Sequence, residues 1–345
     1  MIRDSIETAV SGKDIPEAQM IETMEEIMGG HATPAQIGAL LVALRMKGES
    51  IEEITAAAKV MRAKSSRIPY KCEDGEFLID TCGTGGDCSN TFNVSTTVAF
   101  VVAGAGVKVA KHGNRSVSSK CGSADLMESL GLPLDLTPDQ VALCIRHVGI
   151  GFLFAPILHS AMKHAIGPRR ELGVRTIFNL LGPLTNPAGA QVQLMGVYDD
   201  KMVKPLTYVL ARLGSRKAFV VHGHGGLDEI SLSGPTLVGS AQDGNVSFRY
   251  VEPSDFGLRA EPSAAIRGGS AQENVSITRA VLKGEPGPNR DVVLLNAAAA
   301  LVASDRARTL MEGMALATFS IDSGAAYNKL EELIEFAGSL QNGGH

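Results

Sequence analysis

Apolar side chains recur at helical spacing through the first 65 residues of the chain. Residues three and four apart share one face of a helix, so stripes at this spacing predict amphipathic helices. Three such stripes are present: Ile21, Met24 and Met28; Ile37, Leu40, Leu41 and Leu44; and Ile51, Ile54, Ala58 and Met61. This region is therefore expected to form a small helical domain.

Helix starts in this region are marked by short oxygen-bearing side chains placed three residues before Glu or Gln. In this pattern the first side chain caps free N–H groups while the later one reaches back. The pairs are Asp14 and Glu17, Thr33 and Gln36, and Ser50 and Glu53. Pro34 lies just inside the second start, and Gly29 and Gly48 predict left-handed helix ends.

From about Phe77 the pattern changes to short β-rich runs that end in glycine or polar loops. The clearest runs are residues 77–80 (FLID), 107–110 (VKVA) and 218–222 (AFVVH), each followed by a helical pattern. This alternation predicts an α/β fold with parallel strands, whose ligands bind at the carboxyl ends of the strands. Residues 246–251 predict a hairpin-like piece, and residues 290–303 predict a buried late helix.

Size and composition fit a globular protein of about two domains, at roughly 150 residues per domain. The 345 residues are 44% hydrophobic and 20% charged. The net charge of −5 gives no general attraction for nucleic acid or an anionic membrane, so any bound anion must be held by local groups. The chain has no Trp and five Tyr, which also argues against aromatic platforms for nucleic-acid bases.

The five cysteines predict free thiols and a cytoplasmic protein. Their number is odd and no C-x-x-C pair is present, whereas disulfide frameworks and zinc sites need such pairing. Residues 1–10 lack an apolar segment, so no signal peptide is expected. The most apolar stretches, residues 98–107 and 292–302, fall short of the about 20 residues that span a bilayer, so no membrane segment is expected.

A glycine-rich loop, residues 81–87 (TCGTGGD), follows the first β-rich run. Three glycines in four residues let the backbone adopt positive φ and approach a ligand closely. Residues 93–97 (NVSTT) then lead an apolar helix, and its N-terminus together with the loop N–H groups predicts a nest for phosphate. The spacing is neither that of a Walker A loop nor G-x-G-x-x-G, and a simple strand–helix turn is the alternative.

Basic and polar residues follow the second run, at residues 111–115 (KHGNR) and 116–120 (SVSSK). Residues 122–125 (GSAD) then open another helix, with Ser123 as its expected cap. Charge-assisted hydrogen bonds to phosphate contribute about 1.5–3 kcal/mol each, so two such strand ends suit a ligand with more than one phosphate. A solvated surface loop is the alternative.

Two adjacent carboxylates, Asp228 and Glu229, follow the third run. Their oxygens suit Mg²⁺, which would neutralise a pyrophosphate held by the glycine loop. A solvated acidic pair is the alternative. His222 and His224 have no nearby Cys, and we expect ordinary loop histidines rather than zinc ligands.

A basic segment, residues 159–170, ends in the adjacent arginines Arg169 and Arg170. It predicts either an exposed basic helix face or a guanidinium fork for a substrate carboxylate, for which Arg is better suited than Lys. The pattern does not choose between the two arginines.

Together these motifs resemble the anthranilate phosphoribosyltransferases over essentially the whole chain. The matching segments are residues 83–87, 93–96, 111–115, 122–125, 175–187 (RTIFNLLGPLTNP), 226–231 and 292–300. The resemblance implies a small N-terminal α-helical domain and a larger α/β domain with a central, mostly parallel sheet flanked by helices. Residues 1–70 are expected to form the first, joined by a returning helical segment at about 160–185, and residues 71–345 the second. It also implies a homodimer through the helical part.

The resemblance further implies transfer of the 5-phosphoribosyl group from phosphoribosyl pyrophosphate to the amine of anthranilate, in L-tryptophan biosynthesis. The residues implied to bind phosphoribosyl pyrophosphate are Gly83, Gly86, Asp87, Thr91, Asn93, Val94, Ser95, Thr96, Lys111, His112, Gly113, Asn114, Arg115, Ser116, Val117, Ser118, Ser119 and Ser123. Those implied to bind anthranilate are Gly83, Asn114 and Arg169, which selects Arg169 over its neighbour. Ser95, Asp228 and Glu229 are implied to bind Mg²⁺, with two ions expected. No residue is assigned as acid or base, although His112 is a candidate for proton transfer.

Two residues depart from the family pattern: Cys88 replaces a usual glycine and Cys121 replaces a common serine. Both are small, so unchanged chemistry is expected, and either thiol is a candidate for oxidation. Pyrimidine nucleoside phosphorylases share the two-domain architecture and are the alternative function, although their usual phosphate motifs are not found. A nucleic-acid binder is a second alternative, against which the charge and the acidic pair argue. The sequence leaves open an anthranilate synthase subunit as a partner.

Overall fold

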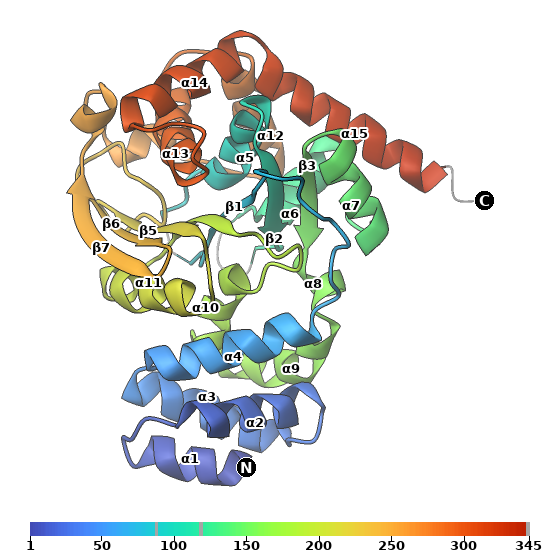
Figure 1. The fold of residues 1–345 in the computed structure, drawn as a ribbon, viewed down its shortest axis with the longest axis vertical. Coiled ribbons are helices and arrows are strands. Elements are labelled where there is room, and N and C mark those ends of the chain that lie inside the picture. The colour runs from blue at the N-terminus through green and yellow to red at the C-terminus, as the bar shows by residue number, and fades with distance from the viewer. Residues whose placement is uncertain (87–88, 117–119, 343–345) are drawn as a thin grey trace.

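The chain folds into a helical part and a larger part built on one sheet (Figure 1). The structure, a computed structural model, describes residues 1–86, 89–116 and 120–342. The helical part consists of α1 (Ile2–Val10), α2 (Glu17–Met28), α3 (Pro34–Lys47), α4 (Ile51–Lys64), α9 (Lys163–Leu172) and α10 (Ile177–Leu184). Because α9 packs on α2 and α3 and α10 packs on α4, a segment far along the chain returns to complete this bundle.

Two of the three predicted helix starts are confirmed. The hydroxyl of Thr33 accepts a hydrogen bond from the N–H of Gln36 at 3.3 Å, and that of Ser50 accepts one from Glu53 at 3.2 Å. In both cases the later side chain also reaches back to the N–H of the capping residue. At the end of α3, Gly48 has the predicted positive φ of 88°, but its ψ of 128° lies outside the left-handed helical region that was expected.

Two predictions at α2 are wrong. Asp14 does not cap the helix, because Pro16 disfavours helical backbone at the residue before it and α2 starts after the proline, without a side-chain cap. Asp14 instead pairs with Lys47 at 2.6 Å. Gly29 ends the helix with a right-handed φ of −79°, and the left-handed turn falls one residue later, at Gly30.

The larger part contains a seven-stranded sheet in the order β3-β2-β1-β4-β5-β6-β7. The strands are β1 (Leu78–Gly83), β2 (Lys108–Gly113), β3 (Ile150–Phe154), β4 (Val192–Gly196), β5 (Lys217–Gly223), β6 (Thr236–Gln242) and β7 (Asn245–Val251). The first five strands are parallel, and β6 and β7 form an antiparallel hairpin at the edge. This confirms the predicted α/β fold with a mostly parallel sheet, and the hairpin at residues 246–251.

The strand order places a topological switch point between β1 and β4. From β1 the chain moves outward through β2 and β3, then returns to the other side of β1 with β4 and β5. Gly83 and Gly196 end these two central strands and lie opposite each other. In open α/β sheets, ligands bind at the carboxyl ends of strands beside such a point.

Helices cover both faces of the sheet. They are α5 (Val94–Gly104), α6 (Ser123–Leu130), α7 (Pro138–His147), α8 (Ala155–Leu158), α11 (Val203–Arg212), α12 (Ala271–Leu282), α13 (Pro288–Ala303), α14 (Leu310–Asp322) and α15 (Ala325–Asn342). Short 3-10 turns lie at Ser160–Met162, Asp200–Met202, Pro253–Phe256 and Ser263–Ile266. α13 is buried over most of its length, which confirms the late buried helix predicted at residues 290–303. In the described residues, no helix is long and apolar enough to cross a membrane.

Alternate residues of the central strands belong to two separate hydrophobic cores. Leu194 and Phe219 face one core, which is shared with α5 and α13. Met195 and Val220 face the other, which is continuous with the interior of the helical bundle. The period-2 alternation of a strand therefore ties the bundle directly to one face of the sheet.

Candidate active site

Asp228, from the loop after β5, lies over the two glycines at the switch point. A Cβ on Gly83 would lie 2.5 Å from the Asp228 Oδ2, and a Cβ on Gly196 would overlap the carbonyl oxygen of Asp228. Real Cβ atoms essentially never come this close, so Gly196 must be glycine for the Asp228 backbone to approach, and a side chain at Gly83 would displace the Asp228 carboxylate. The acidic pair predicted from the sequence is thus located at the centre of the carboxyl edge of the sheet.

The glycine loop is hydrogen-bonded to the end of β4 and to the loop after β5. β1 continues through Gly83, so the residues before it belong to the strand rather than to the predicted loop. Gly85 and Gly86 have positive φ values of 64° and 75°. The N–H of Gly85 donates to Asp228 Oδ2 at 3.0 Å, and that of Thr84 donates to the carbonyl of Gly196 at 2.9 Å. Asp87 and Cys88 lie outside the described residues.

Glu229 caps the helix that follows the glycine loop. Its Oε1 accepts a hydrogen bond at 3.1 Å from the N–H of Ser95, in the first turn of α5. Asn93 occupies the N-cap position but makes no capping bond with its side chain. A carboxylate at a helix N-terminus is stabilised by the helix dipole, and here it comes from a distant loop.

Asn93 joins three segments instead. Its Nδ2 donates to the carbonyl of Cys121 at 3.1 Å, and its Oδ1 accepts from Asn274 of α12 at 3.0 Å. Thr91, two residues before Asn93, forms an isolated bridge with Arg267. Three further predicted residues are arranged on the first turn of α5: Val94 and Thr96 are buried, and Ser95 is half-buried. In the described residues, the hydroxyl of Thr96 has no partner.

β2 ends over a buried carboxylate. Lys111, His112 and Gly113 belong to this strand, which corrects the shorter prediction. The N–H of His112 donates to Asp80 Oδ1 at 3.1 Å, and Asn186 donates to Asp80 Oδ2 at 2.8 Å. Burial raises the pKa of Asp80, against the opposing effects of Lys111 and these donors. Lys111 is only 3% exposed, and its ammonium donates to the carbonyl of His112 at 2.9 Å.

Two buried histidines meet beside this strand end. The rings of His112 and His159 lie 5.4 Å apart in an edge-to-face arrangement. Burial lowers the pKa of His112 to about 3, with contributions from His159 and Lys111, and lowers that of His159 to about 4. Both rings are therefore neutral at pH 7. Across the described part of the chain, the Nε2 atoms of both have no hydrogen-bond partner.

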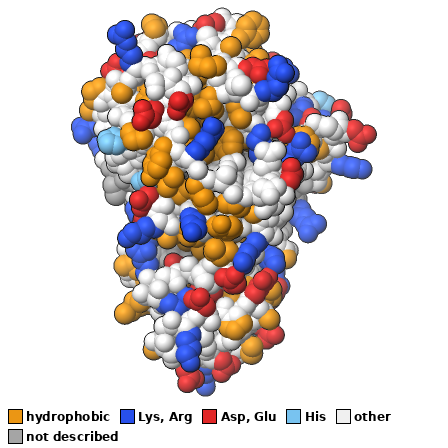
Figure 2. Space-filling view, turned by 60° about the vertical axis from the view of Figure 1, so that its left-hand side comes forward, with side chains coloured by type: hydrophobic (Ala, Val, Ile, Leu, Met, Phe, Trp, Pro, Cys, Tyr) orange, Lys and Arg blue, Asp and Glu red, His pale blue; other side chains and the backbone are white. Residues whose placement is uncertain are grey.

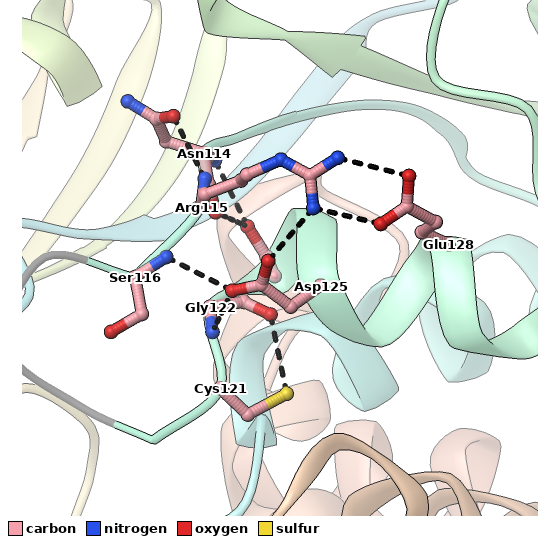
Figure 3. Close-up of polar contacts among 8 residues, drawn as sticks. Asn114, Arg115, Ser116, Cys121, Gly122, Asp125 and Glu128 are labelled. Atoms are coloured by element: carbon pink, nitrogen blue, oxygen red, sulfur yellow. Dashed lines mark hydrogen bonds and ion pairs between the residues drawn. The ribbon is translucent and has the colours of Figure 1, made fainter.

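The loop after β2 is closed by Asp125 of α6 (Figure 3). One of its oxygens accepts from the N–H groups of Ser116 at 3.0 Å and Gly122 at 2.8 Å, and the other from Arg115 at 3.0 Å. Burial opposes ionisation of Asp125, but these hydrogen bonds lower its pKa. Arg115 also binds Glu128 with both terminal nitrogens, so its guanidinium points toward α6 (Figure 3).

The prediction that Ser123 caps α6 is wrong. Gly122 occupies the capping position, and the carboxylate of Asp125 accepts a hydrogen bond from the Gly122 N–H. The hydroxyl of Ser123 instead accepts from the N–H of Asn114 at 3.2 Å. Val117, Ser118 and Ser119 lie outside the described residues.

The two adjacent arginines of α9 have different surroundings. Arg169 is half-buried, with its guanidinium carbon 5.2 Å from the ring centroid of Phe178, and burial lowers its pKa. Arg170 is exposed. Asn114, at the end of β2, is also exposed, and no hydrogen bond joins it to Arg169 in the part of the chain that the structure describes.

Known proteins match the chain over almost its whole length. A glycosyl transferase family model for the helical bundle domain covers residues 3–65, and that family's a/b domain covers residues 75–327. Anthranilate phosphoribosyltransferase from Symbiobacterium thermophilum is 59% identical over 96% of both chains. That from Pelotomaculum thermopropionicum is 54% identical over 99% of both.

The chain belongs to the anthranilate phosphoribosyltransferases.

Solved members of the anthranilate phosphoribosyltransferase family have the same fold. The enzyme from Thermus thermophilus superposes with a TM-score of 0.91 at 42% identity, covering 97% of this chain and 99% of that one. The enzyme from Saccharomyces cerevisiae, in complex with PRPP and Mg, superposes with a TM-score of 0.88 at 29% identity, covering 98% of each chain. Another yeast structure is a complex with 4-fluoroanthranilate.

Several residues that organise this candidate site were not singled out from the sequence. They are Asp80, Asp125, Asn186, Gly196 and Asn274. Asp125 had a local signal, since it is the third residue of a helix that begins after glycine. The other four act on partners far away in sequence, which a local pattern does not reveal.

Proposed function

We propose that this chain transfers the 5-phosphoribosyl group from phosphoribosyl pyrophosphate to the amine of anthranilate. The products are N-(5-phosphoribosyl)anthranilate and pyrophosphate, in L-tryptophan biosynthesis. One observation carries the proposal: Asp228 and Glu229, adjacent in sequence, hold the glycine loop and the N-terminus of α5 side by side at the switch point. Both backbones offer N–H groups to anions, and both carboxylates are next to them.

The sugar diphosphate is assigned to the loops after β1 and β2. Gly83, Gly86, Asp87 and Thr91 would bind it from the first loop, and Asn93, Val94, Ser95 and Thr96 from the start of α5. The strand end and second loop would contribute Lys111, His112, Gly113, Asn114, Arg115, Ser116, Val117, Ser118, Ser119 and Ser123. Two features support this assignment: the buried Lys111 ammonium near the strand end, and the backbone bonds of Asp125 that gather the two ends of the second loop.

The residues at the switch point fit Mg²⁺. Asp228 and Glu229 supply carboxylate oxygens and Ser95 a hydroxyl, which are donors that this ion prefers, and it commonly combines one or two carboxylates with substrate phosphates. We assign Mg²⁺, as two ions, to these three residues. When bound, Mg²⁺ would neutralise charge on the leaving pyrophosphate.

The chain's own residues would mainly position the two substrates and stabilise the leaving pyrophosphate. An aromatic amine is neutral at pH 7 and already nucleophilic, so no strong base is needed. Orientation of two substrates can supply about 7–11 kcal/mol of the barrier, and N–H groups aimed at developing charge stabilise the leaving pyrophosphate. We expect a loose, oxocarbenium-like transition state at the ribose. His112 is neutral, with a lowered pKa, and is better suited to positioning than to taking up a proton.

Anthranilate is assigned to the side of the site nearest the helical part, with Gly83, Asn114 and Arg169 as its contacts. Arg169 is half-buried against Phe178, which suits a guanidinium that binds a substrate carboxylate. The contact between His112 and His159 links β2 to the segment before α9. It therefore joins the proposed diphosphate-binding strand end to the segment that leads to the helix with the proposed anthranilate contact.

We propose a cytoplasmic homodimer through the helical part, and one helical domain comprising residues 1–70 with the returning segment. A groove of about 600 Å³ between α3 and the end of α9 is lined by Val42, Met46, Leu172 and Val174, with two arginines. Met46 is 83% exposed and Val174 54%. Figure 2 shows apolar side chains gathered at mid-height on one face of the molecule. Exposed apolar patches of this kind mark interfaces. An anthranilate synthase subunit is a second candidate partner.

The decisive experiment is anthranilate fluorescence against time, with phosphoribosyl pyrophosphate and with or without Mg²⁺. Loss of signal that requires both additions is the expected result. No loss with folded protein would overturn the proposal, and phosphorolysis of thymidine or uridine would then identify a pyrimidine nucleoside phosphorylase. Light scattering across a dilution series tests the dimer, with Met46→Asp as the variant expected to give monomers.

A further inference from the structure

Arg175 contacts the glycine loop from a different part of the fold. It lies in the segment that connects α9 to α10, and its guanidinium carbon stands 3.8 Å from the ring centroid of Tyr198, which follows β4. A Cβ on Gly86 would lie 3.0 Å from Nη2 of Arg175 and 3.3 Å from its guanidinium carbon. The guanidinium is therefore packed between an aromatic face and the backbone of the loop.

Tyr198 holds the same loop through its backbone. Its N–H donates to the Thr84 hydroxyl at 3.3 Å, while the N–H of Thr84 donates to the carbonyl of Gly196 at 2.9 Å. Tyr198 thus anchors the start of the loop through its backbone, and its ring also supports the Arg175 side chain that covers Gly86. The two positive-φ glycines have no side chains of their own to fix their conformation, so such external contacts must do it.

Within the described ranges, no neighbouring carboxylate pairs with the charge of Arg175. Across those same residues, six other arginines form ion pairs, namely Arg115, Arg212, Arg216, Arg279, Arg290 and Arg308, but Arg175 forms none. It is nevertheless half-buried. A cation in such a position keeps its field available for an anion held by the loop that it covers.

We propose that Arg175 is a positioning residue for the diphosphate site. Stacked on Tyr198, it holds the backbone at Gly85 and Gly86 in the conformation that receives the diphosphate, and its charge adds to the attraction for that group. This inference rests on the proposed function of the glycine loop. It also makes the connection between α9 and α10 a part of the site, although that connection belongs to the helical part of the fold.

The test compares Arg175→Ala, Arg175→Lys and Tyr198→Phe in the full chain. Arg175→Ala should raise KM for phosphoribosyl pyrophosphate by about tenfold, with a change within about twofold in KM for anthranilate, because the loop at Gly86 loses both its cover and a nearby positive charge. Tyr198→Phe keeps the aromatic face and should match the unsubstituted protein. Arg175→Lys keeps the charge but loses the planar face, and should give an intermediate KM.

Arg216→Ala is the matched control. Arg216 also stacks on an aromatic ring, 4.0 Å from the centroid of Phe77, but at the opposite end of the strands, and it pairs with Asp305. Its loss should lower the melting temperature without changing either KM. If Arg175→Ala raises both KM values equally, or if Arg216→Ala produces the same selective change, the positioning role is overturned.

A second measurement separates this inference from the proposed reaction. Pyrophosphate with Mg²⁺ should raise the melting temperature of the unsubstituted protein, and the rise should be largely lost in Arg175→Ala. Equal shifts in both proteins, or no shift in either, overturn the role of Arg175. This result does not depend on turnover, so absence of anthranilate consumption would overturn the reaction while the pyrophosphate shift still decides the inference.

Discussion

The side chain of Glu229 accepts a hydrogen bond from the N–H of Ser95 at 3.1 Å, across a sequence separation of 134 residues. A single carboxylate is thereby both the cap of α5 and a proposed Mg²⁺ ligand. Glu229→Gln keeps an oxygen for the N–H but loses the charge, whereas Glu229→Ala loses both. These two variants separate the structural role from the catalytic one.

Both variants are expected to lose most of kcat, because the negative charge that holds Mg²⁺ is gone in each. Glu229→Ala should in addition destabilise the fold by about 0.5–2 kcal/mol, the usual effect of losing a helix cap. Steady-state kinetics and urea unfolding measure the two effects. Glu312→Ala, which removes a capping-region carboxylate at α14, is the control and should affect stability only. Full kcat in Glu229→Gln would contradict the metal role.

Gly196→Ala should disable the site, although it adds only one methyl group. The new Cβ would overlap the carbonyl oxygen of Asp228, so the loop after β5 must move and the bond from Asp228 to the glycine loop is lost. Overpacking of this kind costs about 1–3 kcal/mol. Activity and melting temperature are measured beside Gly182→Ala, where a Cβ meets no atom within 4 Å. Normal activity in Gly196→Ala would refute this account of the switch point.

Arg169→Ala should mainly raise KM for anthranilate. A group that binds substrate and transition state equally changes KM and leaves kcat in place. We expect an increase of about tenfold or more, since a charge-assisted hydrogen bond contributes about 1.5–3 kcal/mol. Arg170→Ala, on the exposed side of the same helix, is the control and should leave both constants unchanged. Equal losses of kcat in Arg169→Ala and Glu229→Ala would remove the proposed division of labour.

Stability should fall below about pH 6.5. The pKa values of His112 and His159 are lowered to about 3 and about 4 by burial, so between these values and 6.5 the unfolded chain binds more protons than the folded one. Each histidine then removes at most about 1.4 kcal/mol of stability per pH unit as the pH falls. Urea unfolding at pH 7, 6 and 5 measures this loss, and His159→Gln should show a shallower decline. Parallel curves for both proteins would contradict it.

The same lowered pKa makes a prediction about catalysis. A neutral His112 at pH 7 does not titrate near 6.5, so kcat/KM should show no inflection there. The measurement is kcat/KM for phosphoribosyl pyrophosphate from pH 5.5 to 8. An ascending limb near 6.5 that disappears in His112→Asn would assign this histidine to proton transfer instead.

Peroxide should not inactivate the enzyme through Cys121. This thiol is buried, and burial raises its pKa, so little of the reactive thiolate forms at pH 7. Cys121→Ser should therefore lose activity in peroxide at the same rate as the unsubstituted protein, measured as residual turnover against time. Slower loss in the variant would show that Cys121 is the sensitive thiol.

The sequence predicted where the strands lie but not how far they extend. Residues 77–80 and 107–110 mark β1 and β2, yet both strands run three residues further, to Gly83 and Gly113, because pairing with β4 and β3 continues there. Glycine is a poor strand former by itself, so only the neighbouring strand makes these positions extended. The predicted cap at Asp14 is wrong for a related reason, since a nearby proline and a distant lysine decide the local structure.

The candidate site also has a part that the sequence predicts and a part that it does not. The motifs place polar groups at three strand ends, and parallel topology brings these ends to one edge. The contacts that organise the site are different in kind: Glu229 with Ser95, Asn186 with Asp80, and Arg175 with Gly86 each join segments that no local pattern connects. They require the folded chain.

The second hydrophobic core, which the bundle and the sheet share, determines how the protein is expected to unfold. It runs without interruption from Met24 in the bundle to Met195 and Val220 in the sheet. A fragment that began near residue 71 would expose one apolar face of its sheet to solvent. A fragment that ended near residue 71 would lack α9 and α10. The helical and sheet parts are therefore distinct in shape but are expected to unfold together, in a single cooperative melting transition.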